Sequence, residues 1–151
     1  MNAERAYVRD KRSPKPKNAT VSAVMSRIRS TNTKPERMMR AVLAEAGVRG
    51  YRLHHASTPG RPDITFVGRR IAVFVHGCFW HGCPHCQRYT PKHNRAWWRD
   101  KLAANQARDE RKRRELKSAG WKVVTVWECR LKKSPAREAS RVARALATSS
   151  R

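Results

Sequence analysis

The chain has 151 residues, and its 35 Lys+Arg against 11 Asp+Glu give a formal net charge of +24. The length is typical of one compact domain, and the charge favours a polyanionic partner, either nucleic acid or an anionic membrane surface. The longest apolar run, Ile71 to Val75, is far too short for a membrane span, and no apolar signal segment is visible, so a transmembrane or secreted protein is excluded.

The first third of the chain contains an arm, two helices and a strand. Residues 1–23 are basic and poor in large apolar side chains, which predicts a disordered arm facing nucleic acid or, alternatively, a solvated tail without a role. Residues 22–29 suggest a short helix that orders on a partner. A firmer helix is predicted over 35–46, where Thr33 and Glu36 form a capping box, and a strand is expected over 51–54.

The remaining elements alternate between strands and helices. Two β-rich runs, 63–67 and 70–76, predict a hairpin, and 77–94 is expected to be loop. A long helix over 95–119, closed by Gly120, a strand over 122–127 and a helix opening at Ser134-Pro135 complete the order. The sequence therefore predicts an α/β domain over 24–147, a small mixed sheet with flanking helices, before a disordered tail at 148–151.

Four cysteines predict a structural zinc site. Cys78, Cys83 and Cys86 are spaced C-x4-C-x2-C, and Cys129 follows the last predicted strand. Four thiolates close a tetrahedral site that leaves no position for water, and this site would tie the loop to that strand. His85 is an alternative ligand, and four buried free thiols are the remaining alternative.

Two of the few acids stand where a merely adhesive basic protein would not need them. Asp63 enters a strand that reads as buried, where a carboxylate is costly unless it binds a cation, although a turn cap after Pro62 is the simpler explanation. Asp109 lies on one helical face with Leu102 and Leu116 and needs a buried partner such as histidine, or else it pairs with a surface arginine. Glu36 is explained by its capping box.

The histidines and aromatic residues beside the cysteines suggest chemistry on nucleic acid. If the cysteines hold zinc, His76 and His81 are left free near Asp63, and a carboxylate with two histidines provides the groups of a metal-assisted phosphodiesterase. Alternatively, both histidines only line the zinc loop. Phe79 and Trp80 could wedge between bases, whereas Trp97 and Trp98 fit the core better on sequence grounds alone.

Three segments resemble the very short patch repair (Vsr) mismatch endonucleases: Gly60-Arg61-Pro62-Asp63, Val75-His76-Gly77-Cys78-Phe79-Trp80-His81 and Val126-Trp127-Glu128-Cys129. The segment from Met25 to Glu36 agrees as well. The resemblance implies a zinc-stapled relative of the restriction-endonuclease fold. It also implies a DNA repair enzyme that nicks one strand 5′ of the thymine in a T:G mismatch, the product of 5-methylcytosine deamination. A monomeric, cytoplasmic, nucleoid-associated protein acting on double-stranded DNA is then expected.

The resemblance also implies roles for individual residues. Asp63 and the main-chain carbonyl of Val75 would bind catalytic Mg²⁺, and His81, oriented by Asp109, would activate water. His76 would contact the scissile phosphate, and Glu36, which matches an early acidic residue of the family, would be a further catalytic residue. Aromatic residues that intercalate beside the mismatch would be Phe79, Trp80 and Trp98, while Trp97 stays in the core.

Two departures from the family pattern are visible. The spacing at Cys83-Pro84-His85-Cys86 leaves the choice between Cys83 and His85 open. The wider restriction-type carboxylate and lysine are replaced by Phe74-Val75-His76, so that histidine must activate the water. The competing interpretation is a non-enzymatic zinc module that binds nucleic acid, which explains the charge and the cysteines but neither Asp63 nor Asp109.

Overall fold

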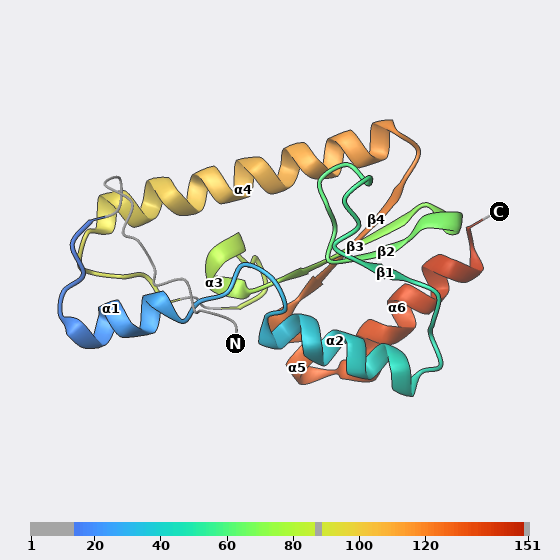
Figure 1. Ribbon diagram of the computed structural model, residues 1–151, viewed down its shortest axis with the longest axis horizontal. Coiled ribbons are helices and arrows are strands. Elements are labelled where there is room, and N and C mark those ends of the chain that lie inside the picture. The colour runs from blue at the N-terminus through green and yellow to red at the C-terminus, as the bar shows by residue number, and fades with distance from the viewer. Residues whose placement is uncertain (1–13, 87–88, 150–151) are drawn as a thin grey trace, which may run out of the picture.

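A four-stranded sheet with helices on both faces organises the computed structural model, which describes residues 14–86 and 89–149 (Figure 1). The strands lie in the order β1-β2-β3-β4; β1 pairs with β2 and β2 with β3 antiparallel, whereas β3 and β4 are parallel. Their bounds are Arg52–Leu53, Ile64–Phe66, Ile71–His76 and Lys122–Trp127. The small mixed sheet expected from the sequence is confirmed.

Six α-helices and one 3-10 turn are present in the described residues. In chain order they are α1 (Ala19–Ser26), α2 (Lys34–Glu45), the turn η1 (Val67–Arg69), α3 (Cys78–His81), α4 (Arg95–Ser118), α5 (Glu128–Lys133) and α6 (Pro135–Ala147). Helices α2, α5 and α6 gather on one face of the sheet, and α4 runs along the other (Figure 1).

The central strand β3 explains this layering, because all six of its residues are buried. Side chains alternate between the two faces of a strand. Accordingly, Ile71, Val73 and Val75 pack into the larger core with α2, α5 and α6, while Ala72 and Phe74 pack with Leu116 of α4. An uninterrupted apolar run of this kind is what a strand covered on both faces requires.

Most predicted elements are confirmed, including the hairpin, the strand at 122–127 and the C-terminal helix beginning at Pro135. The long helix ends as expected before Gly120, whose φ of +81° places it in the left-handed region that favours glycine. Among the described residues, no helix is long and apolar enough to cross a membrane.

Two expectations about local structure were wrong, and one helix was not expected. The arm was expected to be irregular as far as Ala23, but α1 begins at Ala19, where the Asn18 side chain accepts a hydrogen bond from Val21 N–H (2.9 Å) and so caps the helix. The loop expected over 77–94 contains the short helix α3, and α5 directly follows β4. Residues 1–13 and 150–151, the rest of the predicted arm and tail, lie outside the described residues.

Candidate functional site

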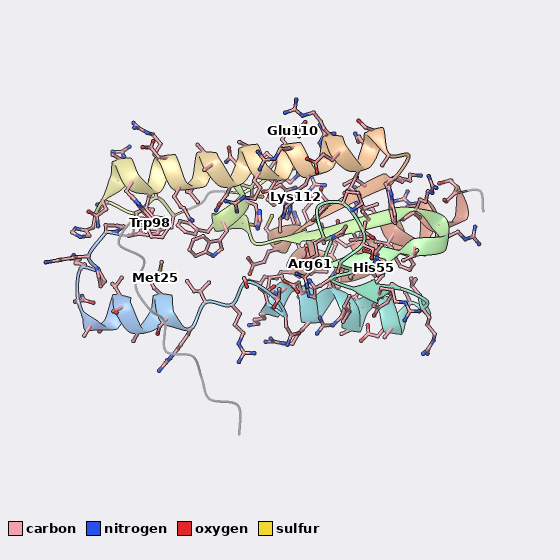
Figure 2. All side chains as sticks on the ribbon, turned by 45° about the horizontal axis from the view of Figure 1, so that its top comes forward. Met25, His55, Arg61, Trp98, Glu110 and Lys112 are labelled. Carbon is pink, nitrogen blue, oxygen red and sulfur yellow. The ribbon has the colours of Figure 1, made fainter. Side chains whose placement is uncertain are left out.

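Asp63 lies directly before β2, and the loop that carries it is tightly constrained. Gly60 has φ +73°, and a Cβ there would lie 3.0 Å from the Lys112 side chain of α4, so a larger residue would push the loop off α4. Arg61 has φ +48°, and its Nε donates to the carbonyl of His54 (3.2 Å). Figure 2 shows Arg61 and Lys112 close to this loop. The conformation therefore fixes where the carboxylate points.

The Asp63 carboxylate is held in the sheet by a backbone hydrogen bond. Its Oδ2 accepts from the Val75 N–H (2.7 Å), and only about a fifth (20%) of the side chain is exposed. Burial raises the pKa of Asp63 to about 6; the Val75 hydrogen bond works against that rise and the nearby Glu36 adds to it. A cation bound here would remove the cost of ionising this carboxyl group, as the sequence analysis anticipated.

Glu36 and His54 meet Asp63 in one cluster whose ligand atoms all lie within 4.8 Å of one another. Glu36 caps its own helix: its Oε1 accepts from the Thr33 hydroxyl (3.0 Å) and its Oε2 from the Asn32 N–H (2.9 Å). His54 Nε2 lies 3.3 Å from Glu36 Oε2. Glu36 and Asp63 were expected from the sequence to be functional residues, whereas His54 was not.

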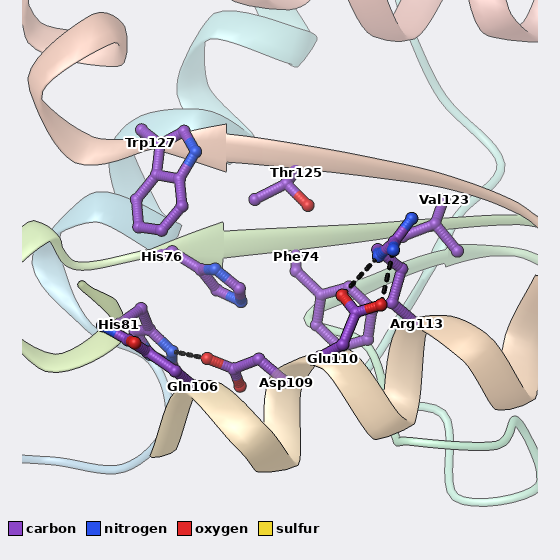
Figure 3. A pocket seen from close by; sticks show the side chains of 10 residues that line it. All are labelled: Phe74, His76, His81, Gln106, Asp109, Glu110, Arg113, Val123, Thr125 and Trp127. Carbon is purple, nitrogen blue, oxygen red and sulfur yellow. Dashed lines mark hydrogen bonds and ion pairs between the residues drawn. The ribbon is translucent and has the colours of Figure 1, made fainter. Parts of the chain in front are cut away.

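A second cluster joins His76, His81 and Asp109, whose ligand atoms also lie within 4.8 Å of one another. His81 Nδ1 is 2.6 Å from Asp109 Oδ2, so the histidine partner expected for Asp109 is present (Figure 3). Burial alone would raise the pKa of Asp109, but its hydrogen bond and attraction to His81 outweigh burial and lower it. The pair holds the His81 ring in one orientation.

His76 stacks on His81, with ring centroids 4.0 Å apart and planes 6° from parallel. It is 8% exposed, and burial, together with repulsion from His81, lowers its pKa to about 4. Its Nδ1 has no hydrogen-bond partner among the described residues. His76 is therefore neutral at physiological pH, and its Nδ1 is both buried and unpaired.

Both clusters open into one cleft of about 1100 Å³. Its walls are the segment joining α1 to α2, the loop carrying Asp63, the end of β3 and the middle of α4. The basic side chains along it are Arg27, Arg29, Lys34, Arg37, Arg61, Lys101, Arg108 and Lys112. A second cavity of about 180 Å³ lies behind His76 and His81, against β4 and the Glu110–Arg113 ion pair (Figure 3). The large cleft thus combines acids at its base with cations along its walls.

The four cysteines come together as the sequence spacing predicted. Their sulfur atoms all lie within 4.8 Å of one another, Cys83 and Cys129 being 3.7 Å apart, and Cys83 is buried. The Cys129 N–H donates to Cys78 Sγ (3.3 Å), which ties the start of α5 to α3. The exposed His85 instead faces Arg130. The group can hold a metal ion with cysteine ligands alone.

Three aromatic rings, from α3 and the start of α4, form a half-buried cluster at the edge of the cleft. Ring centroids of Phe79, Trp80 and Trp98 lie 5.0 to 5.7 Å apart, and Asn105 Nδ2 donates to the Trp80 carbonyl (3.1 Å). Met25 of α1 points toward the side where Trp98 lies (Figure 2). Trp97 was expected in the core, but it is half-buried beside Trp98 and belongs to neither core cluster of the described residues, because it packs at the helix start beyond the sheet.

Comparison with known proteins identifies a family and several relatives. The family model described as DNA mismatch endonuclease Vsr matches residues 14–88. The chain is 46% identical over 116 residues to the type II nicking enzyme V.XorIIP of Xanthomonas oryzae pv. oryzae, covering 77% of this chain and 85% of that enzyme. It is 37% identical over 115 residues to the DNA mismatch endonuclease Vsr of Escherichia coli, covering 76% and 72% respectively.

A further relative, the type II nicking enzyme V.NmeAIP of Neisseria meningitidis, is 42% identical over 111 residues, covering 74% of this chain and 79% of that enzyme. The fold, the acid and histidine clusters and these relatives together define an endonuclease. More particularly, the chain belongs to the DNA mismatch endonuclease Vsr family, as its sequence motifs suggested.

Proposed function

We propose that this protein is a Mg²⁺-dependent endonuclease that nicks one strand of double-stranded DNA on the 5′ side of the thymine in a T:G mismatch. The observation that carries the proposal is the presence of a buried carboxylate and an oriented histidine in one cleft with basic walls. The relatives named for nicking and mismatch cleavage support the same reaction. The mixed sheet, whose hairpin leads into a parallel strand, is consistent with a relative of the restriction-endonuclease fold.

The donor atoms around Asp63 fit Mg²⁺, which prefers carboxylate and carbonyl oxygen. In a strand, the N–H and C=O of one residue point to the same side. Because Val75 N–H donates to Asp63, the Val75 carbonyl opens on that side too and would be the second protein ligand. A bound Mg²⁺ would neutralise charge on the scissile phosphate and stabilise the leaving 3′-oxygen.

His81 is the base in this proposal. Asp109 holds its Nδ1–H, which leaves Nε2 with a lone pair to accept a proton from water and stabilises the imidazolium that results. His76, held neutral by burial, would donate a hydrogen bond to a phosphate oxygen rather than supply charge. The second hairpin strand offers neither an acid nor a lysine, so the proton must pass to histidine.

Glu36 would not contact the reacting atoms directly. Both of its oxygens already accept hydrogen bonds from residues 32–33, and its side chain is only 6% exposed. We assign it as a positioning residue that fixes the end of α2 and the ring of His54 beside Asp63. The early acidic residue anticipated from the family pattern is thus next to the cation site without needing to touch the substrate.

Recognition of the mismatch falls to the aromatic cluster and the basic walls. The rings of Phe79, Trp80 and Trp98 are mutually packed and half-exposed, so they can insert beside a base step as a preassembled unit. Unstacking costs least where pairing is already poor, which gives part of the selectivity for T:G. The lysines and arginines bind phosphates in a way that does not depend on base sequence.

The cysteine cluster would hold a structural Zn²⁺ through Cys78, Cys83, Cys86 and Cys129. Four thiolates complete the coordination shell, so this ion would take no part in catalysis. Its effect is positional, because it fixes α3, and with it His81, against the end of β4. We further propose that one copy of the chain suffices, since the cleft of a single chain contains every residue assigned above to cation binding and proton transfer.

A nicking assay tests the proposal. With Mg²⁺, the protein should nick a T:G duplex and leave the matched T:A duplex intact, and Asp63→Ala should bind the T:G duplex without cutting it. Glu45→Ala, which removes an exposed acid at the far end of α2, should cut like the unaltered protein. If the zinc-loaded protein leaves every mismatched duplex uncut, the proposal fails and a non-enzymatic DNA-binding module is the better description.

A further inference from the structure

We infer that His54, which lies between Glu36 and Asp63, is a nitrogen ligand of the divalent cation at Asp63, and that it raises the affinity of this site for Mn²⁺ relative to Mg²⁺. The inference rests on the proposed cation site and adds a residue to it. Its first support is proximity: ligand atoms of Glu36, His54 and Asp63 lie within 4.8 Å of one another in the base of the cleft.

The two ring nitrogens of His54 face two different carboxylates. Nε2 lies 3.3 Å from Glu36 Oε2, and Nδ1 lies 3.9 Å from Asp63 Oδ1. The tautomer that carries its hydrogen on Nε2, the nitrogen nearer Glu36, leaves the lone pair of Nδ1 on the Asp63 side. A carboxylate that holds the far ring N–H of a histidine is the usual arrangement around a metal-bound imidazole, because it fixes the tautomer and the ring plane.

The spacing suits two ligands of one ion after a small adjustment. Ligands about 2.1 Å from a metal are about 3.0 Å apart at a right angle and about 3.4 Å apart at a tetrahedral angle. The observed separation of 3.9 Å between Nδ1 and Oδ1 is therefore slightly wide. Mg²⁺ and Mn²⁺ are octahedral ions whose neighbouring ligands lie at the right angle, so a cation would need to draw the two atoms together by about 0.9 Å, which a side-chain rotation supplies.

The backbone of His54 is held as a ligand position requires. Its φ of +45° lies in the left-handed region, which is uncommon for a residue with a Cβ and is maintained by its surroundings. The His54 N–H donates to the Asp63 carbonyl (3.2 Å), and the His54 carbonyl accepts from Arg61 Nε (3.2 Å). Two hydrogen bonds thus hold an unfavourable conformation that places the ring between the two acids.

The chemical consequence is a change in metal preference. Mg²⁺ is a hard cation that favours oxygen and retains its water, whereas Mn²⁺ accepts imidazole nitrogen more readily. A site with Asp63 and Val75 oxygens alone would suit Mg²⁺. Adding His54 Nδ1 keeps that site usable by Mg²⁺ and raises its relative affinity for Mn²⁺.

The test is electron spin echo envelope modulation of Mn²⁺ bound to the full-length, zinc-loaded protein without DNA. We expect modulation from a directly bound ¹⁴N in the unaltered protein and in His81→Gln, and its loss in His54→Gln. Glutamine offers an oxygen in place of Nδ1, so titration of His54→Gln should show Mg²⁺ affinity within threefold of normal and Mn²⁺ affinity lower by roughly tenfold. Circular dichroism confirms that each variant is folded.

Two results would overturn the inference: one refutes His54 as a ligand alone, and the other also refutes the proposed cation site. If Asp63→Asn abolishes Mn²⁺ binding but the ¹⁴N signal is absent from the unaltered protein or persists in His54→Gln, His54 is no ligand and the proposed cation site stands. If Asp63→Asn leaves Mn²⁺ binding unchanged, the cation site itself is misplaced, and the proposed function loses its metal together with this inference.

Discussion

Replacing Asp63 with Asn should stabilise the protein at neutral and alkaline pH when no divalent cation is added. Burial raises the pKa of this carboxyl group from 3.8 to about 6, so its folded form resists ionisation. Each tenfold change in a protonation equilibrium is worth 1.36 kcal/mol, and the difference between those two pKa values therefore corresponds to about 3 kcal/mol. Asparagine has the same shape and can accept the Val75 N–H without ionising.

The pH window follows from the sign of the shift. Because the folded pKa is raised, the stability associated with a protonated Asp63 is fully present below pH 3.8 and is lost as the pH rises through about 6. Asp63→Asn should therefore match the unaltered protein near pH 4 and exceed its free energy of unfolding by about 3 kcal/mol at pH 8.

Urea unfolding at a series of pH values, with the cysteine site kept loaded with zinc, measures this difference. Saturating Mg²⁺ should stabilise the unaltered protein and not the variant, because a ligand that binds only the folded state adds to its stability. A variant that is equally stable or less stable at pH 8 would refute the reasoning. A gain that is the same at every pH would show that shape, not ionisation, is responsible.

Three further predictions concern the histidines and the cysteines. Asp109→Asn should lower the single-turnover nicking rate by about 10²-fold, because an amide orients the His81 imidazolium without stabilising its charge. DNA affinity, measured by anisotropy titration, should stay unchanged. An equal loss of nicking rate and DNA affinity would point to a structural role. Because the pKa of His76 is lowered from 6.5 to about 4, the free energy of unfolding of the unaltered protein should fall by up to about 3 kcal/mol as the pH falls through this range. His76→Phe should remove that fall, which urea unfolding at a series of pH values measures. Cys129→Ser should lower the zinc content and the Tm together, and a full zinc content in that variant would show that Cys129 is not a zinc ligand.

Local patterns in the sequence were sufficient to predict much of the fold. The hairpin at 64–76 and the strand at 122–127 follow from apolar β-branched runs with turn residues between them. The missed helices have physical reasons. Residues 78–81 are poor helix formers, and their single turn is fixed by the neighbouring cysteines and by the contacts of His81 with His76 and Asp109. Helix α5 has only six residues and directly follows a strand, so it is too short to show a helical apolar repeat.

The candidate site was predictable wherever a residue was anomalous in its own neighbourhood. Asp63 at a strand entrance and Asp109 on an apolar helix face each required an unusual partner, and for Asp109 the contact with His81 is confirmed. His54 gave no such signal, because its meeting with Glu36 depends on how α2 packs beside the β1–β2 pair. Trp97 was misassigned because an aromatic residue on a helix gives no clue that the helix extends beyond the sheet.

The parallel pairing of β3 with β4 has a consequence for the order of events during synthesis. Asp63, His76 and His81 lie in the part of the chain that ends with the β2–β3 hairpin and α3, whereas Asp109 lies in the crossover helix α4 and Cys129 directly follows the returning strand β4. Parallel strands need such a long connection, and contacts between distant segments form late in folding. A nascent chain still missing α4 and β4 would contain Asp63 and His81 without Asp109 to orient the histidine. On the proposed mechanism we therefore expect that such a partial chain does not cut DNA.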